Sequence, residues 1–175
     1  MNTNKNTIKL VKMALVVAIY VAVTGVLAPI SFGSIQFRLS EVMILLVFVD
    51  SAYVLPLTLG CVISNYLFST MGILDVVCGS LATYITLILI CKTKSLMMKK
   101  DQSNKLQVLF ISSIWASVVN GIIVGGELYY ALQLPFVLSA VQVAAGEFGV
   151  VSIVGVALFK FLTDHETLAN RLKLA

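Results

Sequence analysis

The chain has 175 residues, of which 59% are hydrophobic and only 11% are charged, and its formal net charge is +4. A soluble domain is about 25% charged, and at this size it buries only about 70% of the surface that its unfolded chain exposes. The composition therefore excludes a soluble globular protein, a disordered chain and a nucleic-acid-binding protein. It fits one integral membrane domain over residues 1–175, with the lipid bilayer as its surroundings.

Six apolar runs predict an all-α bundle of six transmembrane helices, since about 20 apolar residues cross a hydrocarbon core about 30 Å thick. These runs cover residues 10–28, 39–49, 53–69, 73–91, 106–124 and 136–162. The first run is longer than the apolar region of a signal peptide and five more follow it, so we expect a membrane span rather than a cleaved leader. The second run would cover only about 16 Å as an α-helix. It is either a half-helix completed by the 29–38 loop or one arm of a re-entrant hairpin with the third run.

The charges predict the orientation of this bundle. With both termini in the cytoplasm, eleven of the twelve basic residues fall on the inner side and only Arg38 falls outside, which is a strong positive-inside signal. Four acidic residues accompany the inner basic ones, so the inner side carries a formal charge of +7. The outer half carries Arg38 and the other four acidic residues, which gives −3.

Polar side chains of several predicted helices gather in this outer half. A buried ionisable group costs about 2.5 kcal/mol or more at the centre of a membrane helix, so such groups are candidates for a functional site. An outward-facing pocket would explain them together, whereas each alone could be structural, for example as an ion pair that caps the second span. Asn120 and Glu127 are seven residues apart and share a helix face unless Gly125-Gly126 ends the helix first. The candidate substrate-binding residues are Gln36, Arg38, Glu41, Asn65, Asp75, Asn120, Glu127 and Glu147, together with Trp115 as an aromatic side chain that could stack on a flat ring.

Ala14, Ala18 and Ala22 place small side chains on one face of the first span. This spacing allows close approach of another helix, either within the same bundle or from a partner protein. No catalytic residue, metal site or cofactor is predicted, because the sequence lacks G-x-x-x-x-G-K-[ST], G-x-S-x-G and H-E-x-x-H and its three cysteines show no C-x-x-C pairing.

Several segments resemble the QueT family. The most specific is FGSIQFRLSE at residues 32–41, and weaker matches are Gly60-Cys61 with Ser64-Asn65, DVVCGSLAT at 75–83, VVNGIIVGGEL at 118–128 and Gly146-Glu147. QueT proteins are substrate-binding S components of energy-coupling factor (ECF) transporters in the bacterial plasma membrane, and they are assigned to the uptake of queuosine precursors. The resemblance implies a transmembrane coupling protein and two cytoplasmic ATPases as partners. It also makes the alanine face of the first span similar to the surface that meets the coupling protein.

The resemblance suggests which part of the ligand each candidate residue contacts. Queuosine precursors are 7-deazaguanines, whose N1–H and exocyclic amine form a donor pair that one carboxylate can accept. We expect Glu147 or Asp75 to read this edge, Asn120 and Gln36 to complete the polar contacts, and Glu127 or Glu41 to meet the amine of an aminomethyl precursor. The alternatives are an S component for another vitamin, such as a flavin or thiamine, and a self-sufficient proton- or sodium-coupled carrier that uses Glu147. A membrane enzyme is disfavoured because no nucleophile–base pair is present.

Overall fold

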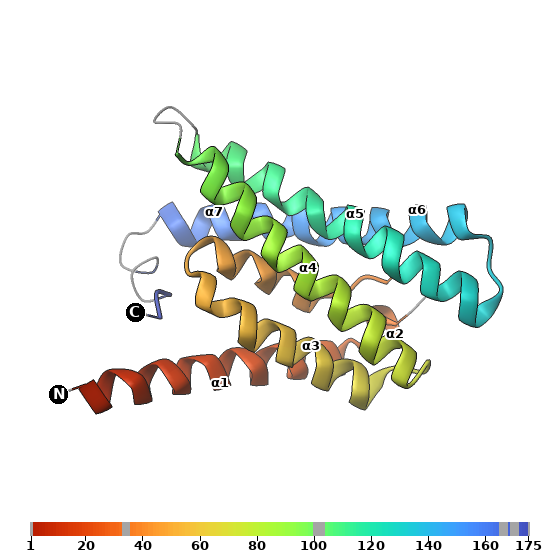
Figure 1. Ribbon diagram of the computed structural model, residues 1–175, viewed down its shortest axis with the longest axis horizontal. Helices are drawn as coiled ribbons and strands as arrows, with labels where there is room; N and C mark the ends of the chain where they lie inside the picture. The colour runs from red at the N-terminus through yellow and green to blue at the C-terminus, as the bar shows by residue number, and fades with distance from the viewer. Residues whose placement is uncertain (1, 33–35, 100–103, 165–167, 169–171, 175) are drawn as a thin grey trace.

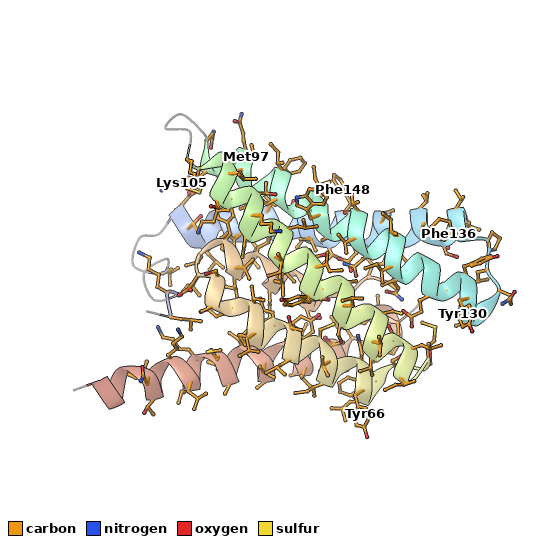
Figure 2. The ribbon with its side chains drawn as sticks, in the orientation of Figure 1. Tyr66, Met97, Lys105, Tyr130, Phe136 and Phe148 are labelled. Carbon is orange, nitrogen blue, oxygen red and sulfur yellow. The ribbon has the colours of Figure 1, made fainter. Side chains whose placement is uncertain are left out.

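The computed structural model describes residues 2–32, 36–99, 104–164, 168 and 172–174, and over these residues it contains helices and no strand. The helices form an elongated bundle with both termini at one end (Figure 1). The end of α4 (Ile73–Met97) and the start of α5 (Lys105–Leu132) lie at that same end. We call it the lysine end, because four lysines gather there: Lys94, Lys105, Lys160 and Lys173. Tyr66, Tyr130 and Phe136 lie at the opposite end (Figure 2).

Five helical segments of the described part are long and apolar enough to cross a membrane. They are Asn6–Val26, Ser51–Phe68, Ile73–Met97, Lys105–Leu132 and Phe136–Asp164. They match five of the six predicted runs, so the predicted membrane-embedded helical class is confirmed. The sixth run is a shorter apolar helix, Leu39–Phe48, and the count of six spans stays a prediction.

The first helix is peripheral. Helix α1 (Asn2–Val26) packs mainly against α3 (Val54–Phe68), and only 11% of its apolar window is buried, compared with 61% for α5. A short helix, α2 (Ala28–Ser31), follows it within the segment that was expected to be a loop. Pro29 lies in the first turn of α2, where its missing N–H costs no hydrogen bond.

The short second run is a 3₁₀ helix, η1 (Leu39–Phe48), which is followed by a brief 3₁₀ turn, η2 (Ser51–Tyr53). A 3₁₀ helix rises about 2.0 Å per residue, so the ten residues of η1 cover about 20 Å, more than the same residues would cover as an α-helix. Runs of this length are uncommon because 3₁₀ hydrogen bonds are poorer. Packing compensates, since Ile44 and Leu45 are completely buried in the larger apolar cluster of the described residues.

Helices α3, α4, α5 and α6 (Phe136–Glu147) pack in sequence order, each against the next. Helix α5 continues through Gly125-Gly126 to Leu132, beyond the expected end of the fifth run. The last span is continuous from α6 through a π-helical stretch, η3 (Phe148–Gly155), into α7 (Val156–Asp164). A π-helix inside an α-helix is uncommon and is often found next to a functional site.

The C-terminal residues are bound to the lysine end by two hydrogen bonds. Tyr53 Oη donates a 2.6 Å hydrogen bond to the carbonyl of Leu172, and the amide of Leu174 donates a 3.0 Å bond to Asp50 Oδ2. Partial burial would raise the pKa of Asp50, but the bonds from the Ala52 and Leu174 amides keep this pKa below its usual value. The carboxylate of Asp50 therefore stabilises the turn before η2 and holds the chain terminus in place.

Candidate functional site

The site is built around the buried carboxylate of Glu41, in the first turn of η1. Glu41 Oε1 accepts a hydrogen bond from Tyr20 Oη of α1 and a second, 3.1 Å long, from Thr83 Oγ1 of α4. Both donors are completely buried. The other oxygen, Oε2, accepts no hydrogen bond from the described residues. Glu41 is thus held in a fixed position by two helices while one of its oxygens stays available.

Arg38 is the one buried basic side chain of the described residues, and it faces this carboxylate. Its Nη1 lies 4.0 Å from Glu41 Oε1 and 3.6 Å from Cys61 Sγ, and its guanidinium lies over the ring of Phe32 at 5.0 Å from the centroid. Its Nε and Nη2 donate no hydrogen bond to the described residues. A guanidinium carries five N–H donors, so part of its hydrogen-bonding capacity is unused here.

A second carboxylate belongs to Asp75, in the first turn of α4, where the helix dipole favours a negative charge. Asn65 Nδ2 of α3 donates a 2.9 Å bond to the Asp75 carbonyl, which joins the ends of the two helices. Close packing requires the glycine at position 79, because a Cβ there would lie 2.6 Å from Asn65 Nδ2. Both carboxylate oxygens of Asp75 are buried and accept no hydrogen bond from the described residues.

Helix α5 and the span that follows supply two further carboxylates. Asn120 and Glu127 are both buried on α5, and Asn120 Nδ2 donates a 3.0 Å bond to the Ala116 carbonyl. Neither oxygen of Glu127 accepts a hydrogen bond from the described residues. Glu147 is buried at the end of α6, immediately before the π-helical stretch, and its Oε2 is also without a donor.

These groups form one electrostatic unit, which we call the acid cluster: Arg38, Glu41, Asp75, Glu127 and Glu147. The charge of Arg38 acts on each of the four carboxylates, Asp75 acts on Glu127, and Glu41 acts on Glu147. With all groups ionised the cluster carries a formal charge of −3. Six of its carboxylate oxygens are buried and lack a hydrogen-bond donor, and an uncompensated buried charge is strongly destabilising. The arrangement therefore suits a ligand that brings several N–H donors or a positive charge.

Eight of the nine predicted site residues are buried, and Trp115 is the exception. Its indole N–H donates a 2.9 Å bond to Thr93 Oγ1, toward the lysine end of α4. Thr93 and Asp75 are 18 residues apart on the same helix, or roughly 27 Å along its axis. Trp115 therefore bonds a part of α4 that is far from Asp75. Gln36 is buried beside Arg38 in sequence and has a left-handed φ of 35°, which is unusual for a residue other than glycine.

Tyr20, Cys61 and Thr83 contact the cluster although sequence reasoning did not select them as site residues. Thr83 lies eight residues after Asp75 with Gly79 between them, so a stripe of polar and small residues at spacing four was the available signal. Tyr20 carried no such signal, because one tyrosine within an apolar run is ordinary. Its position became informative only through the hydrogen bond to Glu41.

The alanine face of α1 is uncovered. Ala14, Ala18 and Ala22 are all exposed, and the described residues of the bundle do not pack over them. The opposite side of α1 makes the internal contact, since a Cβ at Gly60 of α3 would lie 3.0 Å from Tyr20. The sequence left open whether these alanines contact a helix of the same bundle or of a partner protein, and their exposure disfavours a contact within the bundle.

A bundle of membrane-length helices defines a multi-pass membrane protein, and the buried carboxylates among its helices mark a candidate functional site. Comparison with known proteins gives the particular family. The family model described as QueT transporter matches residues 10–164, and the chain belongs to this family of plasma-membrane transporters. The resemblance seen in the sequence is thereby confirmed.

A curated relative is similar over most of its length. It is the queuosine precursor transporter QueT of Lactococcus lactis subsp. cremoris (strain MG1363), which is 34% identical over 148 residues, or 81% of this chain and 85% of the relative. No solved structure matches the chain.

Proposed function

We propose that the chain binds a queuosine precursor in the acid cluster, as the substrate-binding subunit of an ECF importer. The observation that carries this proposal is the set of six buried carboxylate oxygens without donors, together with the unused N–H groups of Arg38. A 7-deazaguanine offers N–H donors to carboxylates and a ring carbonyl to a guanidinium. The name of the Lactococcus lactis relative supports this substrate class.

The hydrogen bonds already present favour particular roles. Asp75 has both oxygens available, so it can accept the N1–H and the exocyclic amine of the ligand together, while Glu147 is the alternative. Glu41 is already engaged by Tyr20 and Thr83, which favours Glu127 for the aminomethyl cation. Asn120 and Gln36 complete the polar contacts in this proposal, and Arg38 meets the carbonyl.

The energy for uptake comes from partner proteins in this proposal. The sequence lacks a P-loop, so two cytoplasmic ATPase subunits would supply the energy through a transmembrane coupling protein. The exposed Ala14, Ala18 and Ala22 of α1 offer that protein a surface that allows close helix approach. The acid cluster would face outward when it captures the ligand, with both termini in the cytoplasm.

A self-sufficient carrier driven by protons or sodium is the second candidate. Glu147 favours it, because this buried carboxylate lies about 16 Å into the last span, near the middle of a membrane. Uptake into vesicles separates the two candidates. The ECF proposal requires the coupling protein and the ATPases with ATP, whereas the carrier candidate requires only this chain and an ion gradient.

Binding to the purified chain tests the ligand. We expect 7-aminomethyl-7-deazaguanine to bind, and we expect Asp75→Asn and Glu127→Gln each to raise its Kd by about 10- to 150-fold, since a hydrogen bond to a charged group contributes about 1.5–3 kcal/mol. Asp50→Asn removes a carboxylate at the lysine end and serves as the matched control with an unchanged Kd. Unchanged binding by both cluster variants would refute the proposed site.

A further inference from the structure

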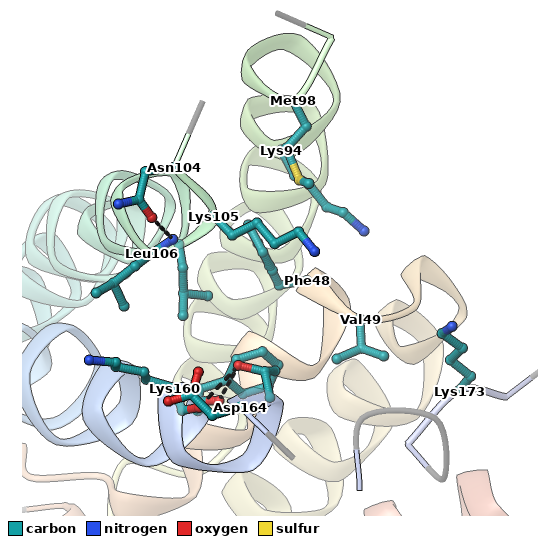
Figure 3. A pocket seen from close by; sticks show the side chains of 13 residues that line it. Phe48, Val49, Lys94, Met98, Asn104, Lys105, Leu106, Lys160, Asp164 and Lys173 are labelled. Carbon is teal, nitrogen blue, oxygen red and sulfur yellow. Dashed lines mark hydrogen bonds between the residues drawn. The ribbon is translucent and has the colours of Figure 1, made fainter. Parts of the chain in front are cut away.

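A hollow of about 680 Å³ opens at the lysine end, and none of its lining residues belongs to the acid cluster (Figure 3). Four lysines from separate parts of the chain line it: Lys94 of α4, Lys105 of α5, Lys160 of α7 and Lys173 of the C-terminal segment. We call it the lysine pocket. Asp164 is the one carboxylate among its lining residues, so the lining carries a formal charge of +3.

The wall of the lysine pocket is apolar beneath the amino groups. Leu109 of α5 and Phe159 of α7 form part of it, and both are buried. Phe48, the last residue of η1, lies under Lys94, whose Nζ is 5.5 Å from the ring centroid. Lys94 and Lys105 extend from their helices toward the same opening above Phe48 (Figure 3). The pocket therefore combines a cationic rim with an apolar wall.

Three of the lysines at the rim lack a carboxylate within ion-pair distance in the described part of the chain. Lys94, Lys105 and Lys160 form no ion pair with the described residues. Lys105 is moreover the first residue of α5, whose first turn contains no acidic residue. The positive end of the helix dipole disfavours a cation at that position, whereas a bound anion there would be stabilised by both the helix end and the lysines.

The positive-inside tendency explains why lysines are abundant at this end of the bundle. It does not explain why lysines from three helices line one hollow with an apolar wall. A phosphate group fits the rim, and the wall fits the glycerol and the first methylenes of an acyl chain. Basic pockets between membrane helices at the cytoplasmic side bind anionic lipid headgroups in this way.

We propose that the lysine pocket binds the headgroup of an anionic glycerophospholipid from the adjacent leaflet. A free phosphate shares the charge of this headgroup but leaves the apolar wall unused. The proposal does not depend on the identity of the transported substrate, because no residue that lines the lysine pocket belongs to the acid cluster.

Lipid titration of the purified full chain tests the proposal, with native mass spectrometry and thermal unfolding as readouts. We expect phosphatidylglycerol to bind and to raise the Tm, and phosphatidylcholine and inorganic phosphate to do neither. Lys94→Gln/Lys105→Gln should weaken phosphatidylglycerol binding by about thirtyfold, or about fivefold for each lysine. Lys105→Gln alone should weaken phosphatidylglycerol binding by about fivefold, and this single variant can be measured even if the double variant is unstable.

Lys92→Gln is the matched control, because Lys92 is exposed on α4 and does not line the lysine pocket. Equal phosphatidylglycerol binding by Lys105→Gln and Lys92→Gln would overturn the proposed site. Equal stabilisation by inorganic phosphate would overturn the lipid as its occupant, and equal binding of phosphatidylcholine would overturn the role of charge.

Discussion

Replacing Gly125 by alanine is expected to force α5 away from α6 and to destabilise the protein. A Cβ at position 125 would lie 2.6 Å from the Cα and 2.9 Å from the backbone nitrogen of Ala140. These are backbone atoms, so the clash is relieved only if the helices move apart. Gly126 provides a matched control in the same helix, because the nearest atom to its added Cβ is the end of the Phe136 ring at 3.9 Å.

The expected magnitude follows from two opposing terms. Alanine has a higher helix propensity than glycine by about 1 kcal/mol, and this gain is common to both substitutions. Overpacking costs about 1–3 kcal/mol and applies to Gly125→Ala alone. The two variants should therefore differ by about 1–3 kcal/mol in stability, which corresponds to a Tm difference of about 2–12 °C for a chain of this size.

Thermal unfolding of both variants in the same detergent measures this difference, and the single tryptophan, Trp115, provides a fluorescence signal. Because α5 carries Glu127 and α6 carries Glu147, Gly125→Ala should also weaken ligand binding while Gly126→Ala should not. A Gly125→Ala protein that is as stable as Gly126→Ala would refute the reasoning that close backbone packing holds these helices together.

Three other predictions follow from single contacts. Tyr20→Phe removes a hydrogen bond to the buried Glu41 carboxylate, so it should lower stability by about 1–3 kcal/mol and weaken ligand binding; an unchanged Tm would contradict this. Gly79→Ala places a Cβ 2.6 Å from Asn65 Nδ2, so it should displace that amide and raise the ligand Kd by about fivefold or more, as measured by titration. Burial alone would raise the pKa of Asp50, but amide hydrogen bonds lower this pKa below its ordinary value of about 3.9. The Asp50 carboxylate therefore stabilises the folded protein above about pH 3.9, and this stabilisation is lost as the pH falls through the lower pKa of the folded state. Between pH 7 and pH 3 the wild-type Tm should accordingly fall further than that of Asp50→Asn, and parallel curves would show that Asp50 does not contribute.

Much of the fold was predictable because lipid limits what an apolar run can do. Each run must satisfy its backbone hydrogen bonds internally, so the runs predict helices and their approximate ends. The exceptions were local. Nothing in residues 39–49 indicated a 3₁₀ helix, and Gly125-Gly126 does not end α5 because Ala140 packs against the glycine backbone.

The candidate site was predictable to the extent that polar residues in apolar runs are costly and therefore conspicuous. That reasoning found the four carboxylates and Arg38, whose charges act on one another in the structure. Trp115 was selected on a different ground, as an aromatic side chain that could stack on a flat ring, and such a side chain gives no sign in the sequence of its depth or direction. Whether the acid cluster binds the substrate stays a prediction.

The sequence by itself determined that this chain is a membrane protein whose lysines gather at one end and whose apolar runs carry acidic residues. These properties depend on composition and on the position of each charged residue along the chain, because apolar runs partition into lipid and lysines stay on the cytoplasmic side. Only the tertiary structure decided which carboxylate is held and which is available, because Tyr20 and Thr83 come from different helices to donate to Glu41. Only the tertiary structure could likewise show that lysines distant in sequence line one hollow, since that depends on how the helix ends pack.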